Sequence, residues 1–212
     1  MRTLVLDEKD FTENRNGFKE YNGKENLSSF VGNLEISAKG YFFFKSLIVS
    51  GYLSIKAGEW IKAGEWIKAG EWIKAGEWIE AGGSIEAGGS IEAGGSIKAG
   101  GSIEAGEWIK AGESIEAGGS IEAARGGITC GLTITCNGLL KFALKLFAGV
   151  SPYPWNSDCE NTVTCGKLEG VVVYGTVIET GIREERETIN IGGETYEVTD
   201  ELKNALHNLK KI

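Results

Sequence analysis

Few side chains in this chain could carry out acid–base or metal chemistry. Histidine, the usual general base of acyl transfer, occurs once in 212 residues, as His207. The same count excludes a catalytic zinc ion held by three histidines. We therefore expect a protein that is not an enzyme, with no catalytic residue, no metal site and no cofactor.

The four cysteines form two pairs with the same spacing, Cys130 with Cys136 and Cys159 with Cys165. A disulfide or a zinc site is one interpretation. The spacing of six equals the length of the repeat described below, however, and it puts Cys130 and Cys136 at a small inward position. Because a buried cysteine behaves as a compact hydrophobic residue, we favour core packing. Whether Cys159 and Cys165 are paired stays open.

Tryptophan is the residue type most suited to binding. Trp60, Trp66, Trp72 and Trp78 each follow a glutamate and precede an isoleucine, and Trp108 repeats the pattern. In a strand, this position points away from the isoleucine side. Neighbouring exposed aromatic residues usually mark an interface, so we expect Trp60, Trp66, Trp72 and Trp78 to meet a second copy of the chain or an unknown protein partner. The alternative is that they only stack on one another across neighbouring strands.

The element that positions these residues is a six-residue repeat. Isoleucine recurs at every sixth position from Ile55 to Ile121 in the unit I-x-A-G-x-x. A period of six keeps no apolar stripe on one side of an α-helix, and a glycine in every unit would destabilise a helix by about 1 kcal/mol each. As a short strand, the unit places isoleucine and alanine on one face, and the glycine begins the bend. The repeat predicts an all-β, single-stranded β-solenoid, in which coils stack about 4.8 Å apart.

Degenerate units extend the repeat on both sides after one seven-residue step each. The predicted isoleucine positions in these flanks are Phe30, Ile36, Phe42 and Ile48 before the regular units, and Ile128, Ile134, Leu140 and Leu146 after them. The alanine position is then predicted to hold Gly32, Ala38, Phe44 and Ser50, and Cys130, Cys136, Phe142 and Ala148.

The period does not determine how many hexads close one coil. Two hexads would give a narrow, flat solenoid, and three would give a triangular prism. We favour two, because one isoleucine and one alanine per face fill only a thin interior. Two hexads per coil would stack Trp60 on Trp72 and Trp66 on Trp78.

Four segments follow from these patterns. We expect an N-terminal cap over 1–29, the solenoid over 30–149, a C-terminal cap over 150–181, and a linker with a ββα tail module over 182–212. In the tail, TINIGGETYEV predicts a hairpin around Gly192 and Gly193. Thr199 or Asp200 then caps a short helix, whose apolar face is formed by Leu202, Ala205, Leu206 and Leu209.

Charge limits the class of partner. The net charge is −8, and residues 55–124 hold twelve acidic and six basic groups. Such a surface repels nucleic-acid phosphate, so we expect no direct nucleic-acid binding. No apolar run has the length of a signal peptide or a membrane helix, which predicts a cytoplasmic protein without a membrane partner.

Three features resemble uncharacterised bacterial and prophage-borne repeat proteins: the I-x-A-G hexads, the run GKLEG before a strand, and the ending IGGETYEVTDELKNAL. The resemblance implies a solenoid of mobile-element origin and implies no activity. The most favoured function is a structural or binding scaffold that presents a rigid surface and a tail interaction module. The alternative is an acidic mimic of nucleic acid that inhibits a DNA-binding enzyme, with Glu80, Glu86, Glu92 and Glu104 in the place of phosphates.

Overall fold

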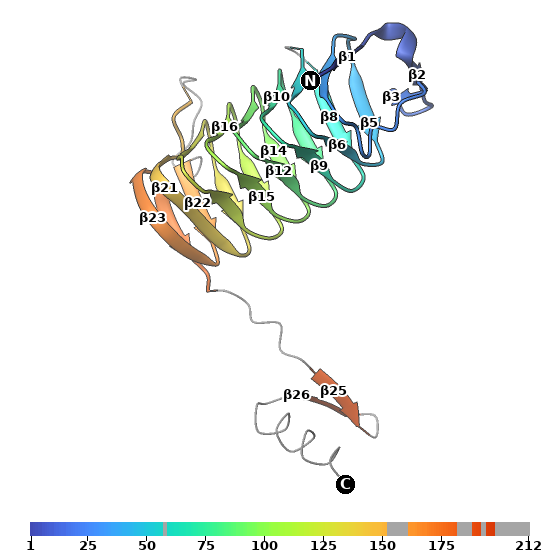
Figure 1. The fold of residues 1–212 in the computed structure, drawn as a ribbon. Coiled ribbons are helices and arrows are strands. Elements are labelled where there is room, and N and C mark those ends of the chain that lie inside the picture. Colours follow the sequence, from blue (N-terminus) through green and yellow to red (C-terminus); the bar gives the residue numbers. More distant parts are fainter. Residues whose placement is uncertain (57–58, 152–160, 182–187, 192–193, 198–212) are drawn as a thin grey trace. The chain divides into compact units, whose positions relative to one another are not determined.

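The structure is a computed structural model that describes residues 1–56, 59–151, 161–181, 188–191 and 194–197. The chain divides into two compact units, Met1–Ile182 and Arg183–Ile212. The first unit is a parallel β-solenoid, as the repeat predicts, with short strands stacked along a rod (Figure 1). The all-β class and the six-residue spacing of the strands are thus confirmed.

Three faces make up the rod, and each strand pairs with the strand that follows three hexads later. Face A is formed by β4 (Asn33–Ile36), β7 (Leu53–Ile55), β10 (Ile73–Ala75), β13 (Ile91–Ala93), β16 (Ile109–Ala111) and β19 (Ile128–Cys130). Face B is formed by β6 (Leu47–Val49), β9 (Ile67–Ala69), β12 (Ile85–Ala87), β15 (Ile103–Ala105) and β18 (Ile121–Ala123). Face C is formed by β5 (Tyr41–Phe44), β8 (Trp60–Ala63), β11 (Ile79–Ala81), β14 (Ile97–Ala99), β17 (Ile115–Ala117), β20 (Ile134–Cys136), β22 (Thr162–Cys165) and β24 (Thr176–Glu179).

The preference for two hexads per coil is wrong. Ile73 pairs with Ile91, and Ile79 pairs with Ile97, so one coil of the regular repeat holds three hexads. The physical reason lies in the bend, because the short connection between strands turns the chain by about a third of a circle and does not reverse it. Three isoleucines, one from each face, then fill the interior together. The prediction considered the isoleucine and alanine of each face separately and so underestimated the width of the interior.

Close stacking of the coils explains the repeated glycine. A Cβ atom added at Gly94 would lie 1.9 Å from the carbonyl oxygen of Gly76 in the preceding coil. The backbone of Gly94 has no positive φ, so the glycine serves close approach and not an unusual conformation. In the last regular unit, Ala124 takes the place of this glycine, and the seven-residue step begins there.

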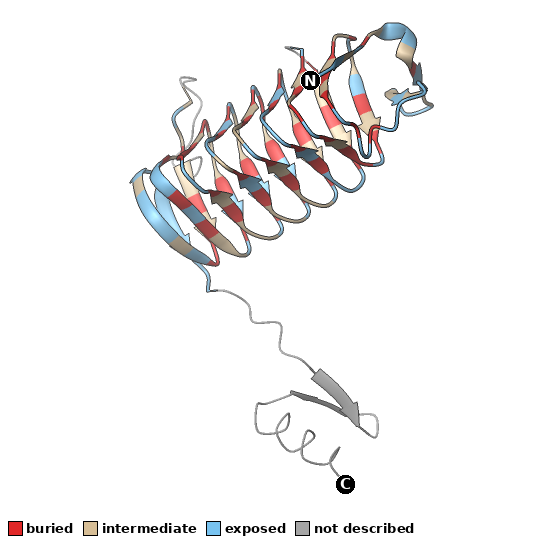
Figure 2. Ribbon diagram, in the orientation of Figure 1, coloured by how far each residue is buried: buried red, intermediate tan, exposed pale blue. Residues whose placement is uncertain are grey.

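The core runs along the whole rod (Figure 2). The repeat isoleucines from Ile61 to Ile134 are buried, as are the alanines or cysteines two positions later. The predicted phase after the regular units is confirmed, since Ile128, Ile134, Leu140 and Leu146 all take the isoleucine position.

The predicted phase before the regular units is correct for only part of the flank. Phe42 and Phe44 pair with Ile61 and Ala63 as expected. Ile48, however, pairs with the outward residue Lys68, and its neighbours Leu47 and Val49 point inward instead.

The same flank is shifted on face A. Leu34 pairs with Leu53, and Leu53 pairs with Ile73. Leu34 and Leu53 therefore take the isoleucine position, and Ile36 and Ile55 take the alanine position. The sequence separations from Leu34 to Leu53 and from Leu53 to Ile73 are both longer than three hexads. A prediction that allows a single seven-residue step in this flank therefore misplaces the register.

Residues before Phe30 add to the N-terminal end of the solenoid. They form β1 (Thr3–Leu6), the 3-10 helix η1 (Glu8–Asp10), β2 (Phe11–Glu13) and β3 (Phe18–Tyr21). β1 pairs in parallel with β4, and β3 pairs in parallel with β5. The ring of Phe11 lies 4.8 Å from that of Phe42, and Phe11 is itself buried, so this end of the core is covered.

Parallel pairing also continues beyond residue 149. The long strand β21 (Leu139–Phe147) pairs with both β18 and β19 and so joins faces A and B. β23 (Lys167–Tyr174) pairs with β21, while β22 and β24 extend face C. These strands form the last coil of the rod.

The second unit contains the predicted hairpin. β25 (Thr188–Ile191) and β26 (Glu194–Glu197) pair antiparallel. The predicted linker over 182–187 and the helix after Asp200 lie outside the described residues.

Candidate interaction surfaces

The described part of the chain contains no group of three histidine, cysteine, aspartate or glutamate side chains that could hold a metal ion. It also contains no helix that could span a membrane. His207 and Cys159 lie outside the described residues.

Three of the cysteines are core residues. Cys130, Cys136 and Cys165 are buried with free thiols. Burial raises the pKa of Cys130 from 9.0 to about 12 and that of Cys136 to about 11, and it also raises the pKa of Cys165. Thiols that resist ionisation are poor nucleophiles and poor metal ligands, so these residues pack the interior as the sequence indicates.

The four tryptophans predicted to form an interface lie on three different sides of the rod. Trp60 and Trp78 lie at the start of strands of face C, Trp66 precedes a strand of face B, and Trp72 precedes one of face A. Three hexads per coil bring Trp60 onto Trp78, with ring centroids 4.6 Å apart and planes 5° from parallel. The pairs expected from two hexads per coil, Trp60 with Trp72 and Trp66 with Trp78, are not formed.

Two of these side chains also contact tyrosines of the flank. Tyr52 stacks on Trp72 with centroids 4.4 Å apart, and Tyr41 meets Trp60 edge to face at 4.8 Å. Trp66, by contrast, is 44% exposed, and no aromatic ring of the described residues stacks on it. The tryptophans therefore stabilise neighbouring coils at two corners of the prism, and no flat surface contains all four.

Serine at the same corner position has a structural role that the sequence did not reveal. Ser84 and Ser102 accept hydrogen bonds from the backbone N–H groups of Ser102 and Ser120, at 3.0 and 3.2 Å. Each hydroxyl thus ties its coil to the next one. Tryptophan and serine are alternative ways to join coils at these corners.

Charged residues occupy the outward position in the middle of each regular strand from β8 to β18. Ion pairs join Lys62 to Glu80 at 2.8 Å and Lys98 to Glu116 at 3.0 Å on face C. Face A repeats the pattern with Lys74 and Glu92, at 3.2 Å. These exposed ion pairs join a lysine of one coil to a glutamate of the next, and each pair contributes little to stability.

The glutamates proposed to imitate phosphates do not form one row. Glu80 lies on face C, Glu92 on face A, and Glu86 and Glu104 on face B. Glu86, Glu104 and Glu122 are direct neighbours on face B. Lysines flank this short row, because Lys68 pairs with Glu86, and Lys141 pairs with Glu122 at 3.2 Å.

Within the residues that the structure describes, no strand covers the core at the C-terminal end of the solenoid. Val163 in β22 and Val177 in β24 are paired neighbours that point inward, but Val163 is 0% exposed and Val177 is 38% exposed. Figure 2 shows the same change, because the strands of the last coil are largely exposed. Four further apolar residues of this coil are exposed, Val171, Val173, Tyr174 and Ile178, but Val171 and Ile178 lie in register with outward residues and are not part of the core.

The backbone of this last coil is also open. β24 ends the face C sheet, and β23 pairs only with β21, so no described strand pairs with the outer edge of either one. Natural edge strands are usually protected by proline, lysine or a covering segment. β24 reads TVIE and has neither proline nor lysine.

No protein-family model, no curated protein and no solved structure matches the chain.

Proposed function

We propose that this protein is a non-enzymatic scaffold, a rigid solenoid rod that associates with a second copy through its last coil. The observation that carries the proposal is the difference between its two ends. Phe11 covers the N-terminal end of the core, whereas Val177 at the other end remains exposed. An apolar layer next to an open strand edge is the usual signature of a surface for strand addition.

A second copy is the occupant that fits this end best. Its last coil has the same triangular outline, so it can cover all three inward rows at once. A twofold axis across the end reverses the strand direction, so β24 of one copy is expected to pair antiparallel with β24 of the other. The same surface then serves both partners.

The experiment compares two Val→Lys variants by sedimentation velocity over a range of concentrations. Val177→Lys places a charge on the uncovered core, where a second copy would bury it. We expect it to weaken association at least about a hundredfold, since an unpaired buried charge costs several kcal/mol. Val171→Lys is the matched control, because Val171 lies in register with the outward residue Lys145 and is 66% exposed.

The proposal predicts a dimer for the unchanged chain and for Val171→Lys, and a folded monomer for Val177→Lys. Circular dichroism of the variants checks the fold. An unchanged chain that stays monomeric at the highest concentration would refute association with a second copy. Equal dimerisation of both variants would refute the location of the interface.

The acidic mimic is the weaker candidate, because its glutamates are divided among the faces and most are paired with lysines. A salt-dependent pull-down of a nucleic-acid enzyme from lysate would support it. The mobile-element origin and the cytoplasmic location remain predictions.

A further inference from the structure

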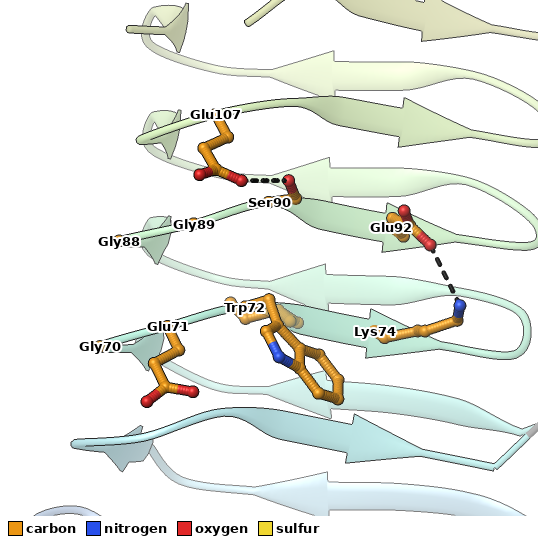
Figure 3. Close-up of a pocket in the computed structure, with 10 residues that line it drawn as sticks. Gly70, Glu71, Trp72, Lys74, Gly88, Gly89, Ser90, Glu92 and Glu107 are labelled. Atoms are coloured by element: carbon orange, nitrogen blue, oxygen red, sulfur yellow. Dashed lines mark hydrogen bonds and ion pairs between the residues drawn. The ribbon is translucent and has the colours of Figure 1, made fainter. Parts of the chain in front are cut away.

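A recess of about 590 Å³ opens on face A where the aromatic column at its corner is interrupted. The column runs from Tyr52 through Trp72 to Ser90 and Trp108, one residue per coil. Gly88, Gly89 and Ser90 form the small-residue wall of the recess, and Trp72 and Glu107 flank it (Figure 3). Its size is in the range of small-molecule and side-chain binding sites.

The direction of the Trp72 ring keeps this recess open. Trp78, at the equivalent corner of face C, lies over the next coil, where a Cβ atom added at Gly95 would meet its ring at 2.2 Å. Trp72 stacks on Tyr52 of the preceding coil, with planes only 2° from parallel, as Trp78 stacks on Trp60, but its ring stays away from the next coil. The nearest Trp72 atom to a Cβ atom added at Gly89 is the tryptophan's own Cβ, at 3.8 Å. Tyr52 is the one aromatic ring of the described residues that stacks on Trp72, so no described ring covers the second face, and Trp72 is 36% exposed.

Negative charge dominates the walls. Three carboxylates, those of Glu71, Glu92 and Glu107, line the recess with one ammonium group, that of Lys74. Lys74 forms an ion pair with Glu92 at 3.2 Å. Within the part of the chain that the structure describes, no cation pairs with Glu71 or Glu107. Among the described residues, the Glu107 carboxylate accepts one long hydrogen bond, 3.4 Å, from the Ser90 hydroxyl (Figure 3).

We propose that this recess binds a guanidinium group, the side chain of an arginine in a peptide or protein partner. The guanidinium plane can stack on the second face of Trp72, continuing the column from Tyr52. Its N–H groups can donate to the carboxylate of Glu107, and Glu71 adds to the negative potential of the walls. An ammonium group is more strongly hydrated and has no plane to stack, so arginine fits the recess better than lysine. The site is independent of the association through the last coil.

The test follows the indole N–H signal of Trp72 by NMR during titration with acetyl-arginine-amide. The matched probe is acetyl-citrulline-amide, which has nearly the same shape but no charge. We expect a saturable shift with the arginine probe and at least about fivefold weaker binding of the citrulline and lysine analogues. Free arginine carries its own carboxylate, which the acidic walls repel, and it should also bind more weakly.

Three variants test the location of the site. Because Trp72→Ser has no Trp72 signal, its binding is measured by intrinsic fluorescence or by calorimetric titration. Trp72→Ser copies the residue used at the same corner by the next coil, so it should stay folded and lose binding at least about fivefold. Glu107→Gln keeps the shape and should also weaken binding. Trp66→Ser, which removes an exposed tryptophan from another face, should leave binding unchanged. Equal binding of citrulline, preference for free arginine or for acetyl-tyrosine-amide, or full binding by Trp72→Ser would each overturn the proposal.

Discussion

The substitution Ile91→Ala tests the assignment of inside and outside at the centre of the rod. Ile91 is fully buried and lies between Ile73 and Ile109 of the neighbouring coils. The change removes three carbon atoms, which corresponds to about 2.4 kcal/mol at roughly 0.8 kcal/mol per buried methylene group. Backbone hydrogen bonds hold the adjacent strands in place, so the cavity cannot collapse. We therefore expect a loss toward the upper part of the range of about 2 to 5 kcal/mol.

The measurement is urea denaturation followed by circular dichroism, with the free energy of unfolding compared between variants. Ser90→Ala in the same coil is the matched control. Its outward hydroxyl makes only two hydrogen bonds of 3.4 Å, to Glu107 and from the N–H of Trp108, so we expect a change of less than about 0.5 kcal/mol. Equal losses for the two variants would refute the assignment of faces.

The remaining predictions concern the repeat glycines, the buried thiols and the tryptophans. In thermal melts, Gly94→Ala should destabilise the fold by about 1 to 3 kcal/mol, because its Cβ atom would clash with the preceding coil. Gly64→Ala is the control and should be nearly neutral, since its Cβ atom would lie 3.5 Å from the nearest atom. In a Cys159→Ser background, the buried thiols should react with maleimide at pH 8 only after denaturant is added. Because the pKa of Cys130 rises from 9.0 to about 12 on folding, the contribution of this thiol to stability should be constant below pH 9 and should fall as the pH rises toward 12. Replacing the four candidate interface tryptophans by serine should leave a folded protein that still associates in sedimentation; loss of association would favour a tryptophan interface over the last coil.

The sequence predicts the interior of the rod well because a strict period leaves few alternatives. Once Ile61 and Ala63 point inward, every later unit in phase must do the same, which holds as far as Leu146. The period carries no information on the angle of each bend, so it could not predict the number of hexads per coil. The predicted register of the degenerate units before the regular hexads was wrong in part for a related reason. There Leu47, Ile48 and Val49 are all apolar, and only the pairing of the strands shows which of them point inward.

The candidate surfaces were less predictable than the core. The positions of the tryptophans on the corners follow from the repeat, but their distribution depends on the coil size. With three hexads per coil, Trp60 meets Trp78, and Trp72 turns to a tyrosine of the degenerate flank. The open end was also hidden, since Val163 and Val177 look alike in sequence and differ only in whether another coil follows.

The most direct test of the central claim is a distance measurement between the ends of two copies. Spin labels are placed at Val171→Cys, on the outer side of the last coil, or at Lys24→Cys, at the opposite end of the chain's solenoid. Cys159→Ser removes the thiol that lies outside the described residues. If the last coils meet face to face, the two Val171 labels lie within about one coil width, roughly 20 Å for a strand and its bend at ~3.3 Å per residue, plus the label arms. Pulsed dipolar spectroscopy should then give a short intermolecular distance for Val171 and none for Lys24. A short distance for Lys24, or none for either label in concentrated samples, would contradict association through the last coil.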